Sequence, residues 1–414
     1  MSLTTVEQRA RPASDRSTTI GLAELMGMAY RREDMTPIWT QLAARIDADP
    51  TDAAALMDLS TILLLTGQRE RGLHFQQVAI GLSAQYRRPH GTGKGIKLLA
   101  LVTQGDFMAN TPLDFLLQGS DVELTLLYLH PNRALPAALP DHDVCFLAIG
   151  ESYEAAPLLA RLGDHIAIWP RPVVNGAADR IVALTRDGVC ATFAADSCVV
   201  VADTVRLGRD ALETTRSEAD LKSLLPGVSF PIIARPIGSH AGAGMAKLDA
   251  PEALHAYLQE CTHDEFYLAP FVDYRSPDGL FRKQRIAFIG GKPFISHMAI
   301  SEHWMVHYLS AGMEEDAAKR AEEGRFFESF DTDFAERHRE AFENLHRRLG
   351  LDYFGIDCAE LPDGRLLVFE VDVAMIVHLL DSEDRYPYKK PAMTKLFKAF
   401  QTHLERASLS GPRG

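Results

Sequence analysis

The segments Tyr353-Phe-Gly-Ile-Asp357 and Phe369-Glu-Val-Asp372 flank the dipeptide Asp363-Gly364 in this sequence. Asp-Gly is a preferred two-residue turn between antiparallel strands, so the two segments are predicted to pair as a hairpin. Such a turn places Asp357 directly opposite Glu370, with Cβ atoms about 4.5–5.5 Å apart. Asp372 lies two residues beyond Glu370 and is therefore predicted to point to the same face.

The predicted hairpin gathers three carboxylates, those of Asp357, Glu370 and Asp372, on one face. Like charges opposed across strands destabilise a sheet unless something neutralises them. Mg²⁺, or Mn²⁺ in its place, would do so, because such hard cations bind a few carboxylates together with phosphate oxygens and water. The alternative is an acidic patch on an exposed sheet face, and the apolar run Leu366-Leu-Val-Phe369 argues against it. These three residues are the predicted metal ligands.

A glycine-rich loop, Gly238-Ser-His-Ala-Gly-Ala-Gly244, follows the predicted strand Ile232-Ile-Ala-Arg235. Glycines let backbone N–H groups approach a phosphate closely, and successive N–H groups form an anion nest. Arg235 ends the strand and could hold phosphate oxygens through its fork of donors. The predicted phosphate-binding residues are Arg235, Gly238, Ser239, His240, Gly242 and Gly244.

Changes in the pattern of apolar and polar residues along the chain predict five regions in a multidomain α/β and α+β protein. Residues 1–19 are expected to be a disordered tail, and residues 20–94 a helical cap that includes one tetratricopeptide-like hairpin. Residues 95–205 alternate strands and helices, which predicts a parallel-sheet domain. Its loops Gly105-Asp106 and Gly150-Glu151 follow strands and are candidate substrate loops. Residues 206–300 form an α+β module with the glycine loop, and residues 301–414 a second module with the hairpin.

The composition narrows the function classes. The chain has 414 residues and a formal charge of −13, which argues against nucleic acid as a partner. Its five cysteines include no CxxC pair, which fits a reducing compartment such as the cytoplasm. The sequence has no apolar run of bilayer-spanning length, so no membrane association is expected.

The hairpin and the glycine loop together resemble the ATP-grasp superfamily, which includes glutathione synthetase and D-alanine–D-alanine ligase. The resemblance runs from about Lys97 to Arg406. It implies an α/β domain followed by two α+β modules that clamp ATP with Mg²⁺. The implied reaction is phosphorylation of a small-molecule or peptide carboxylate to an acyl phosphate, followed by attack of an amine or thiol, with release of ADP. The two substrates are not identified, and the oligomeric state stays open, although dimers are common in the family.

The resemblance also implies roles for single residues. Arg235 takes the place of a phosphate-binding lysine, and Gly188 falls where another lysine is expected, with Arg186 as its substitute. Backbone groups from Ala269 to Phe271 would meet adenine, although Pro270 stands where an acidic residue is common. Arg285 would stabilise the transferred phosphoryl group. Asp372 stands where an asparagine is usual, and it is also a hard oxygen donor.

Substrate contacts are expected from two segments near the reaction centre. One is Ser296 to Tyr308, and the other follows the hairpin and precedes the last helix. A structural role for each residue is the alternative. The candidates are His297, His303, His307, His378, Tyr388 and Lys389; His303 and His307 would share a face if their segment were helical.

Two other functions stay open. The helical region could bind a protein partner, which would make the chain an ATP-binding scaffold or regulator with a degenerate clamp. A small-molecule kinase on the same clamp is the second alternative, because it would need no acceptor.

Overall fold

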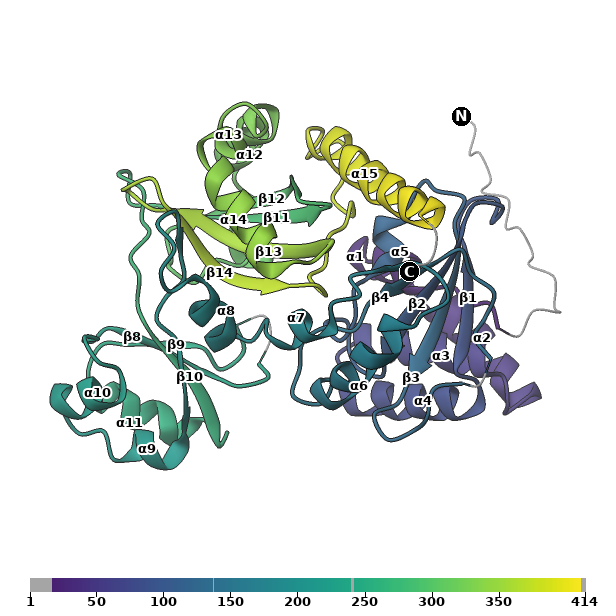
Figure 1. Cartoon of the computed structure of the whole chain (residues 1–414), viewed down its shortest axis with the longest axis horizontal. Coiled ribbons are helices and arrows are strands. Elements are labelled where there is room, and N and C mark those ends of the chain that lie inside the picture. The colour runs from purple at the N-terminus through teal and green to yellow at the C-terminus, as the bar shows by residue number, and fades with distance from the viewer. Residues whose placement is uncertain (1–16, 137, 240–241, 411–414) are drawn as a thin grey trace.

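The N-terminal half of the chain is built on a five-stranded sheet with the order β1-β3-β2-β4-β5 (Figure 1). The computed structural model describes residues 17–136, 138–239 and 242–410. The β2, β3, β4 and β5 strands run parallel, and β1 is antiparallel at one edge. The central residues of β2 are buried on both faces, as the continuous apolar run predicts. The strands are β1 (Gln85–Pro89), β2 (Lys97–Thr103), β3 (Glu123–Leu129), β4 (Val144–Leu147) and β5 (Val173–Val174).

Helices cover both faces of this sheet. One face packs against α3 and α4, which form the single hairpin predicted as tetratricopeptide-like, and the other face packs against α6. The segment predicted as helical through residue 94 also contributes β1 to the sheet, so it is part of this domain rather than a cap on it. The helices are α1 (Leu22–Tyr30), α2 (Thr36–Ala48), α3 (Ala53–Leu65), α4 (Arg69–Leu82), α5 (Leu113–Leu116) and α6 (Ala156–Ala167).

The segment predicted as a tail ends within the described residues. Thr18 forms a β-bridge with Arg87, and Thr19 is buried. The end of this segment therefore lies along β1. Residues 1–16 lie outside the described part of the chain.

A smaller module carries the glycine loop. Its antiparallel sheet has the order β7-β10-β8-β9, and its core cluster, from Leu212 to Leu268, includes no residue from elsewhere among the described residues. Figure 1 shows this module as a separate lobe. Its elements are β7 (Val205–Gly208), α9 (Arg209–Glu213), α10 (Glu218–Leu224), β8 (Ile232–Pro236), β9 (Ala246–Leu248), α11 (Pro251–Glu260) and β10 (Glu265–Pro270). Before it come α7 (Ala178–Val182), α8 (Arg186–Phe193) and β6 (Val199–Val200).

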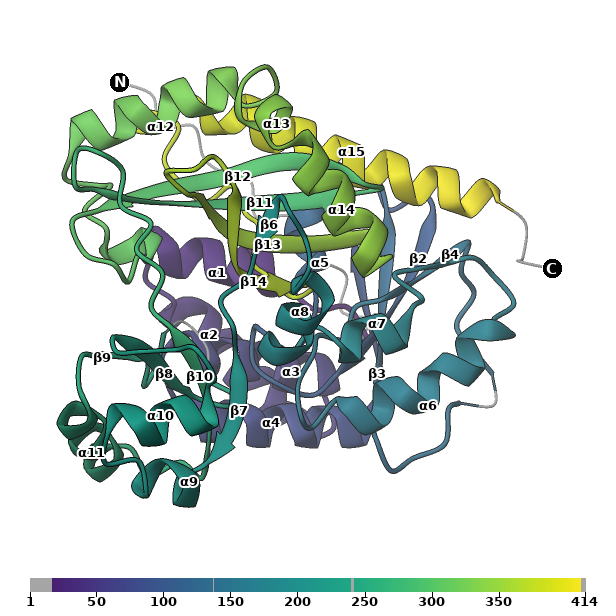
Figure 2. The same cartoon turned by 60° about the vertical axis from the view of Figure 1, so that its left-hand side comes forward.

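The C-terminal sheet has the order β12-β11-β13-β14-β6. It contains β11 (Phe281–Ile289), β12 (Lys292–Ser301), β13 (Tyr353–Glu360) and β14 (Leu366–Asp372). The predicted module boundary near residue 300 therefore differs from the structure, which pairs β11 and β12 with the hairpin. Figure 2 shows the helices α12 (Ala317–Ser329), α13 (Phe334–Arg337), α14 (Arg339–Leu349) and α15 (Lys389–Leu409) beside this sheet. The short helix η1 (Tyr308–Ser310) lies between β12 and α12 in the chain.

The N-terminal domain and the C-terminal sheet share two cores. One core joins Leu99 and Leu147 to Phe288 and Phe354, and the other joins Phe146 to Phe400 on α15. These two parts therefore form one body, to which the glycine-loop module is attached. None of the helices in the described residues is both long and apolar enough to cross a membrane.

Candidate active site

The hairpin β13–β14 pairs Asp357 with Glu370 as predicted, although its turn and its register differ from the prediction. Asp357 lies directly opposite Glu370, as predicted. The turn is not the predicted two-residue turn, because Leu361 N–H donates to the Arg365 carbonyl and encloses a three-residue loop. A register shift between Asp357 and Cys358 makes Phe369 an extra residue in β14 and restores the predicted pairing.

This bulge decides which face the acidic residues take. Before it, Leu366 and Val368 point into the core shared with the N-terminal domain; after it, Val371 does so. Because side chains alternate along a strand, the extra residue turns Glu370 and Asp372 to the opposite face. Without the bulge, Glu370 would follow Leu366 and Val368 into the core.

Four polar residues form a cross-strand row on this face. His297 on β12 lies opposite Arg285 on β11, Arg285 lies opposite Asp357 on β13, and Asp357 lies opposite Glu370 on β14. The row joins the strands at one level of the sheet, so its side chains are neighbours. Hereafter we call these four residues the site row.

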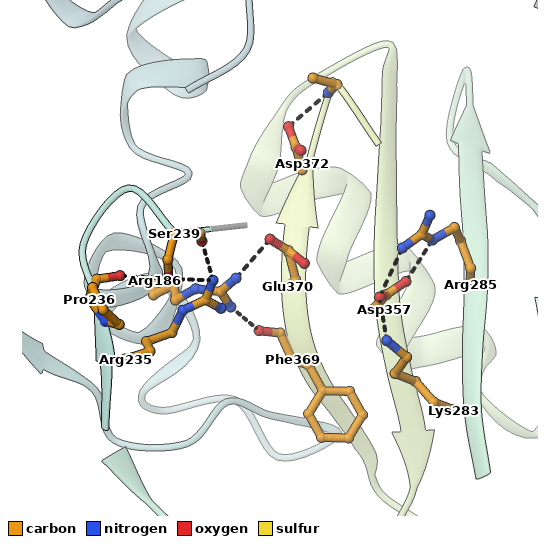
Figure 3. Close-up of polar contacts among 11 residues, drawn as sticks. Arg186, Arg235, Pro236, Ser239, Lys283, Arg285, Asp357, Phe369, Glu370 and Asp372 are labelled. Atoms are coloured by element: carbon orange, nitrogen blue, oxygen red, sulfur yellow. Dashed lines mark hydrogen bonds and ion pairs between the residues drawn. The ribbon is translucent and has the colours of Figure 1, made fainter. Parts of the chain in front are cut away.

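Asp357 is held by two cations, Arg285 and Lys283. Its Oδ1 accepts from Arg285 Nε at 2.8 Å, and its Oδ2 accepts from Arg285 Nη2 at 3.1 Å and from Lys283 Nζ at 2.9 Å (Figure 3). Burial by itself raises the pKa of a carboxyl group, but Arg285 and Lys283 outweigh it and hold the pKa of Asp357 well below its ordinary value. Asp357 is therefore ionised.

Glu370 and Asp372 are less fully engaged. Glu370 Oε1 accepts from Arg186 Nη2 at 2.7 Å, and Asp372 Oδ1 accepts from the Ala374 N–H at 2.7 Å. Desolvation opposes ionisation of Glu370, but Arg186 holds its pKa below the ordinary value. Desolvation and the Glu370 charge raise the pKa of Asp372 to about 7. The second oxygen of each carboxylate accepts no hydrogen bond from the described residues, and Figure 3 shows both side chains on β14.

The N-terminal domain adds a carboxylate to this region. Gly150 packs so closely that an added Cβ would lie 3.0 Å from the Ala374 Cβ, which brings the loop after β4 against the end of β14. Desolvation raises the pKa of the adjacent Glu151 to about 7, and the Glu151 charge contributes to the raised pKa of Asp372. The loops predicted from strand ends therefore include one that borders the site.

Two arginines face the acidic strand from the other side. Arg186, at the start of α8, donates to the carbonyl of the bulged Phe369 at 2.8 Å as well as to Glu370. Arg235, at the end of β8, donates to the carbonyl of Ser239 and so ties the strand to the glycine loop. Arg235 is nine-tenths buried, and its Nε has no hydrogen-bond partner among the described residues. Desolvation and the nearby Arg186 lower the pKa of Arg235 to about 10.

The glycine loop reaches the C-terminal module at Gly242. This residue has φ +74°, and an added Cβ would lie 2.5 Å from His307 Nε2. A side chain at this position would therefore be both strained and blocked. Gly238 and Gly244 also have positive φ, and the Ser239 hydroxyl donates to the Pro236 carbonyl at 2.8 Å. His240, another predicted phosphate contact, lies outside the described residues.

The predicted adenine contacts lie at the end of β10. Ala269 is paired with Ile233 of β8, and the Phe271 N–H donates to the Pro231 carbonyl at 3.0 Å. The Phe271 ring lies under Lys247 Nζ, 4.6 Å from the ring centre. The N–H of Phe271 is therefore already used within the module.

Three of the predicted substrate histidines lie around Arg285. The positive charge of Arg285 contributes to a lowered pKa at His297, His307 and His378, with burial as the larger cause at each. The pKa of His378 falls to about 4. All three rings are therefore neutral at pH 7.

The other predicted substrate residues are placed differently. His303 is exposed, and its segment is not helical, so it does not share a helical face with His307. Tyr388 donates its hydroxyl proton to Glu323 at 2.7 Å, and Lys389 donates to Asp381 at 2.6 Å. Lys389 is buried. The polar ends of Tyr388 and Lys389 therefore hold internal partners.

Lys283 was not among the predicted site residues, and Glu151 was predicted only as part of a candidate substrate loop, although each carried a signal. Lys283 lies two residues before Arg285 on one strand, and the two-residue period puts both on one face. Glu151 directly follows Gly150 at the carboxyl end of a buried strand.

Comparisons with known proteins give remote similarities. No protein-family model matches the chain, and no curated protein matches it. A RimK domain ATP-grasp protein from Sphaerobacter thermophilus gives a TM-score of 0.41 at 16% identity, over 74% of this chain and 99% of that one. The D-alanine–D-alanine ligase of Bacillus anthracis, complexed with ATP, gives a TM-score of 0.43 at 14% identity, over 77% of this chain and 100% of that one. The D-alanine–D-alanine ligase of Coxiella burnetii gives a TM-score of 0.45 at 12% identity, over 76% of this chain and 98% of that one. Since all three TM-scores lie below 0.5, the chemistry must be argued from this chain's own residues.

Proposed function

We propose that this protein is an ATP-dependent, Mg²⁺-dependent ligase that joins a carboxylate to an amine or a thiol and releases ADP. The observation that carries the proposal is that two groups of polar residues, one in each module, face each other. The site row presents Arg285 beside acidic residues, and Arg235 with the glycine loop faces it from the other module. Cations on both sides, with the backbone N–H groups of the glycine loop on one side, suit a polyphosphate.

The donor set fits a divalent cation that shares phosphate oxygens. Glu370 and Asp372 each keep one carboxylate oxygen without a partner in the described residues. Those residues contain no group of three or more ligating side chains placed to hold a metal by themselves. Mg²⁺ needs only one or two carboxylates when phosphates complete its shell, so Glu370 and Asp372 would hold it. It would neutralise charge on the transferred phosphoryl group.

The residues of the chain would serve phosphoryl transfer by position and charge. The substrate carboxylate attacks the γ-phosphorus of ATP, the bond to the bridging oxygen breaks, and ADP leaves. Arg285 and Arg235 neutralise charge on the phosphoryl oxygens during this step. The nucleophile then attacks the acyl carbon of the acyl phosphate, phosphate leaves with the bonding electron pair, and the nucleophile loses a proton. An amide or a thioester results.

The experiment is ATP turnover with Mg²⁺ against pools of amino acids and small carboxylates, with mass spectrometry of the products. Glu370→Gln should abolish turnover, whereas Glu383→Gln should not, because Glu383 is an exposed partner of Lys390. ADP together with a new amide or thioester supports the ligase. A stable phosphorylated product would instead establish a kinase, and ATP binding without turnover in any pool would favour the scaffold.

A further inference from the structure

The carboxylate of Asp357 is already neutralised by side chains of this chain. Its two oxygens receive three hydrogen bonds from Arg285 and Lys283, and its side chain is only 4% exposed. A carboxylate offers about four acceptor positions, so little capacity remains. Two positive charges face this single negative charge.

Lys283 is the less expected of the two cations. It lies on β11 two residues before Arg285, and its side chain is 13% exposed. Its ammonium group makes no other ion pair in the described residues. A lysine whose only close partner is a buried carboxylate is held there, because withdrawal would leave that carboxylate with one cation fewer.

An ammonium group and a divalent cation cannot share this position. Mg²⁺ binds carboxylate oxygens at about 2.0–2.1 Å, whereas Lys283 Nζ stands 2.9 Å from Oδ2. An arriving cation would meet the charges of both Lys283 and Arg285. Glu370 has one cation at hydrogen-bond distance, Arg186, and Asp372 has none in the described residues, so each keeps an oxygen that no described residue uses.

We propose that Lys283 is a resident cation of the active site, which occupies Asp357 and limits the site to one divalent cation, held by Glu370 and Asp372. Asp357 is then a positioning residue that fixes Lys283 and Arg285, not a metal ligand. The inference rests on the proposed function only in that it assumes a nucleotide and a divalent cation bind at this site.

The test is the stoichiometry of Mn²⁺ binding to the full chain, measured by electron paramagnetic resonance with a non-hydrolysable ATP analogue present. The wild type should bind one Mn²⁺. Lys283→Met should bind two, because Asp357 then keeps only Arg285 as its partner and the position of the ammonium group on Oδ2 becomes open. Lys283→Arg, which keeps the charge, should still bind one. Two Mn²⁺ ions in the wild type, or none, would overturn the proposal, as would one ion in a folded Lys283→Met variant.

A second pair of variants keeps the proposal testable if Lys283→Met fails to fold. Asp357→Asn should weaken Mn²⁺ binding by no more than about tenfold, and Glu370→Gln should weaken it by more than about a hundredfold. Equal losses in the two variants would make Asp357 a ligand and overturn the proposal. Because no turnover is measured, an inactive protein that binds one Mn²⁺ would contradict the ligase function without contradicting the role of Lys283.

Discussion

Two buried carboxylates of this protein show that the partners of a carboxylate decide whether burial raises its pKa. Asp357 and Asp58 are both almost completely buried. Asp357 has two cations within hydrogen-bond distance, and its pKa lies well below the ordinary value. Within the described part of the chain, Asp58 on α3 accepts hydrogen bonds from backbone N–H groups alone, those of Ile20 and Gly21. Burial raises the pKa of Asp58 to about 6. Neutral donors therefore do not compensate desolvation as direct ion pairs do.

The raised pKa of Asp58 predicts a pH-dependent stability. Between its unfolded value of 3.8 and about 6, the folded state holds a proton that the unfolded state has lost. The stability that this group contributes is therefore full below the lower value and is lost as the pH rises through 6. Asp58→Asn removes the titrating group and with it this loss of stability at high pH. We therefore expect the free energy of unfolding of the variant to exceed that of the wild type by about 1–2 kcal/mol at pH 7.5 and not to exceed it at pH 4.

Urea unfolding at both pH values checks this prediction. Asp47→Asn is a matched control, because Asp47 is exposed, and it should change the unfolding midpoint little at either pH. A variant at Asp58 that is less stable than the wild type at pH 7.5 would show that its charged hydrogen bonds outweigh burial.

The candidate site could be predicted from the sequence where charges follow strand periodicity. Asp357, Glu370 and Arg285 were predicted, and the structure places them in one row. Lys283 was missed because lysine on a strand ordinarily reaches solvent, and only the contact with Asp357 shows otherwise. Tyr388 and Lys389 were predicted as substrate contacts, but Tyr388 donates to Glu323, 65 residues away, and Lys389 donates to Asp381 in the irregular segment before α15, where no periodicity applies.

At the scale of the element, the hairpin shows how two local features can compensate. The sequence suggested a two-residue turn, whereas the structure has a three-residue loop and, further along, a bulge at Phe369. Each changes the register by one residue, in opposite directions. A bulge has no strong sequence signature, because it depends on which face each side chain must take. Here Val371 must enter the core and Glu370 must not.

Deletion of Phe369 tests the bulge. We expect it to turn Glu370 and Asp372 toward the core, since removal of one residue moves each following side chain to the other face. The cost of burying these carboxylates should exceed about 4 kcal/mol, and the cooperative unfolding transition should be lost or fall sharply in a thermal melt.

Phe369→Ala is the matched control, because it keeps the residue count. It loses the edge-to-face contact with Tyr274, whose ring centre lies 4.9 Å away. Since Phe369 is only partly buried, the cost should be below the roughly 3–5 kcal/mol of a fully buried phenylalanine. Similar unfolding midpoints for the two variants would mean that the bulge does not set the faces of β14.

At the scale of the whole molecule, the division of the buried hydrophobic residues into separate cores predicts which part of the structure moves. The N-terminal domain and the C-terminal sheet share two cores, while the module of residues 205–270 has its own. Asn175 fastens the first two further, because its side chain exchanges two hydrogen bonds with the Tyr353 backbone, at 2.6 and 2.7 Å. The glycine-loop module is therefore the part that can shift as a unit.

We expect a nucleotide with Mg²⁺ to draw this module toward the site row, because Arg235 would then share phosphate oxygens with Arg285. Small-angle X-ray scattering should show a smaller radius of gyration with a non-hydrolysable ATP analogue than without it. Arg235→Ala should bind the analogue more weakly and reduce the change. An unchanged radius at saturating analogue would show that the module is already in its bound position.

The glycine-loop module, which has its own core, lies in the sequence between the two halves of the body, the N-terminal domain and the C-terminal sheet. The strands β2 and β4 are synthesised before it, and their core partners on β11 and α15 are synthesised after it. The body therefore cannot complete its core until the module has emerged. Once the module folds, it brings its two ends to fixed positions and shortens the effective loop to be closed, although the entropy of loop closure grows only by about 0.6 kcal/mol for each doubling of length. If the module folds first, it holds the two halves of the body closer together while their shared cores form.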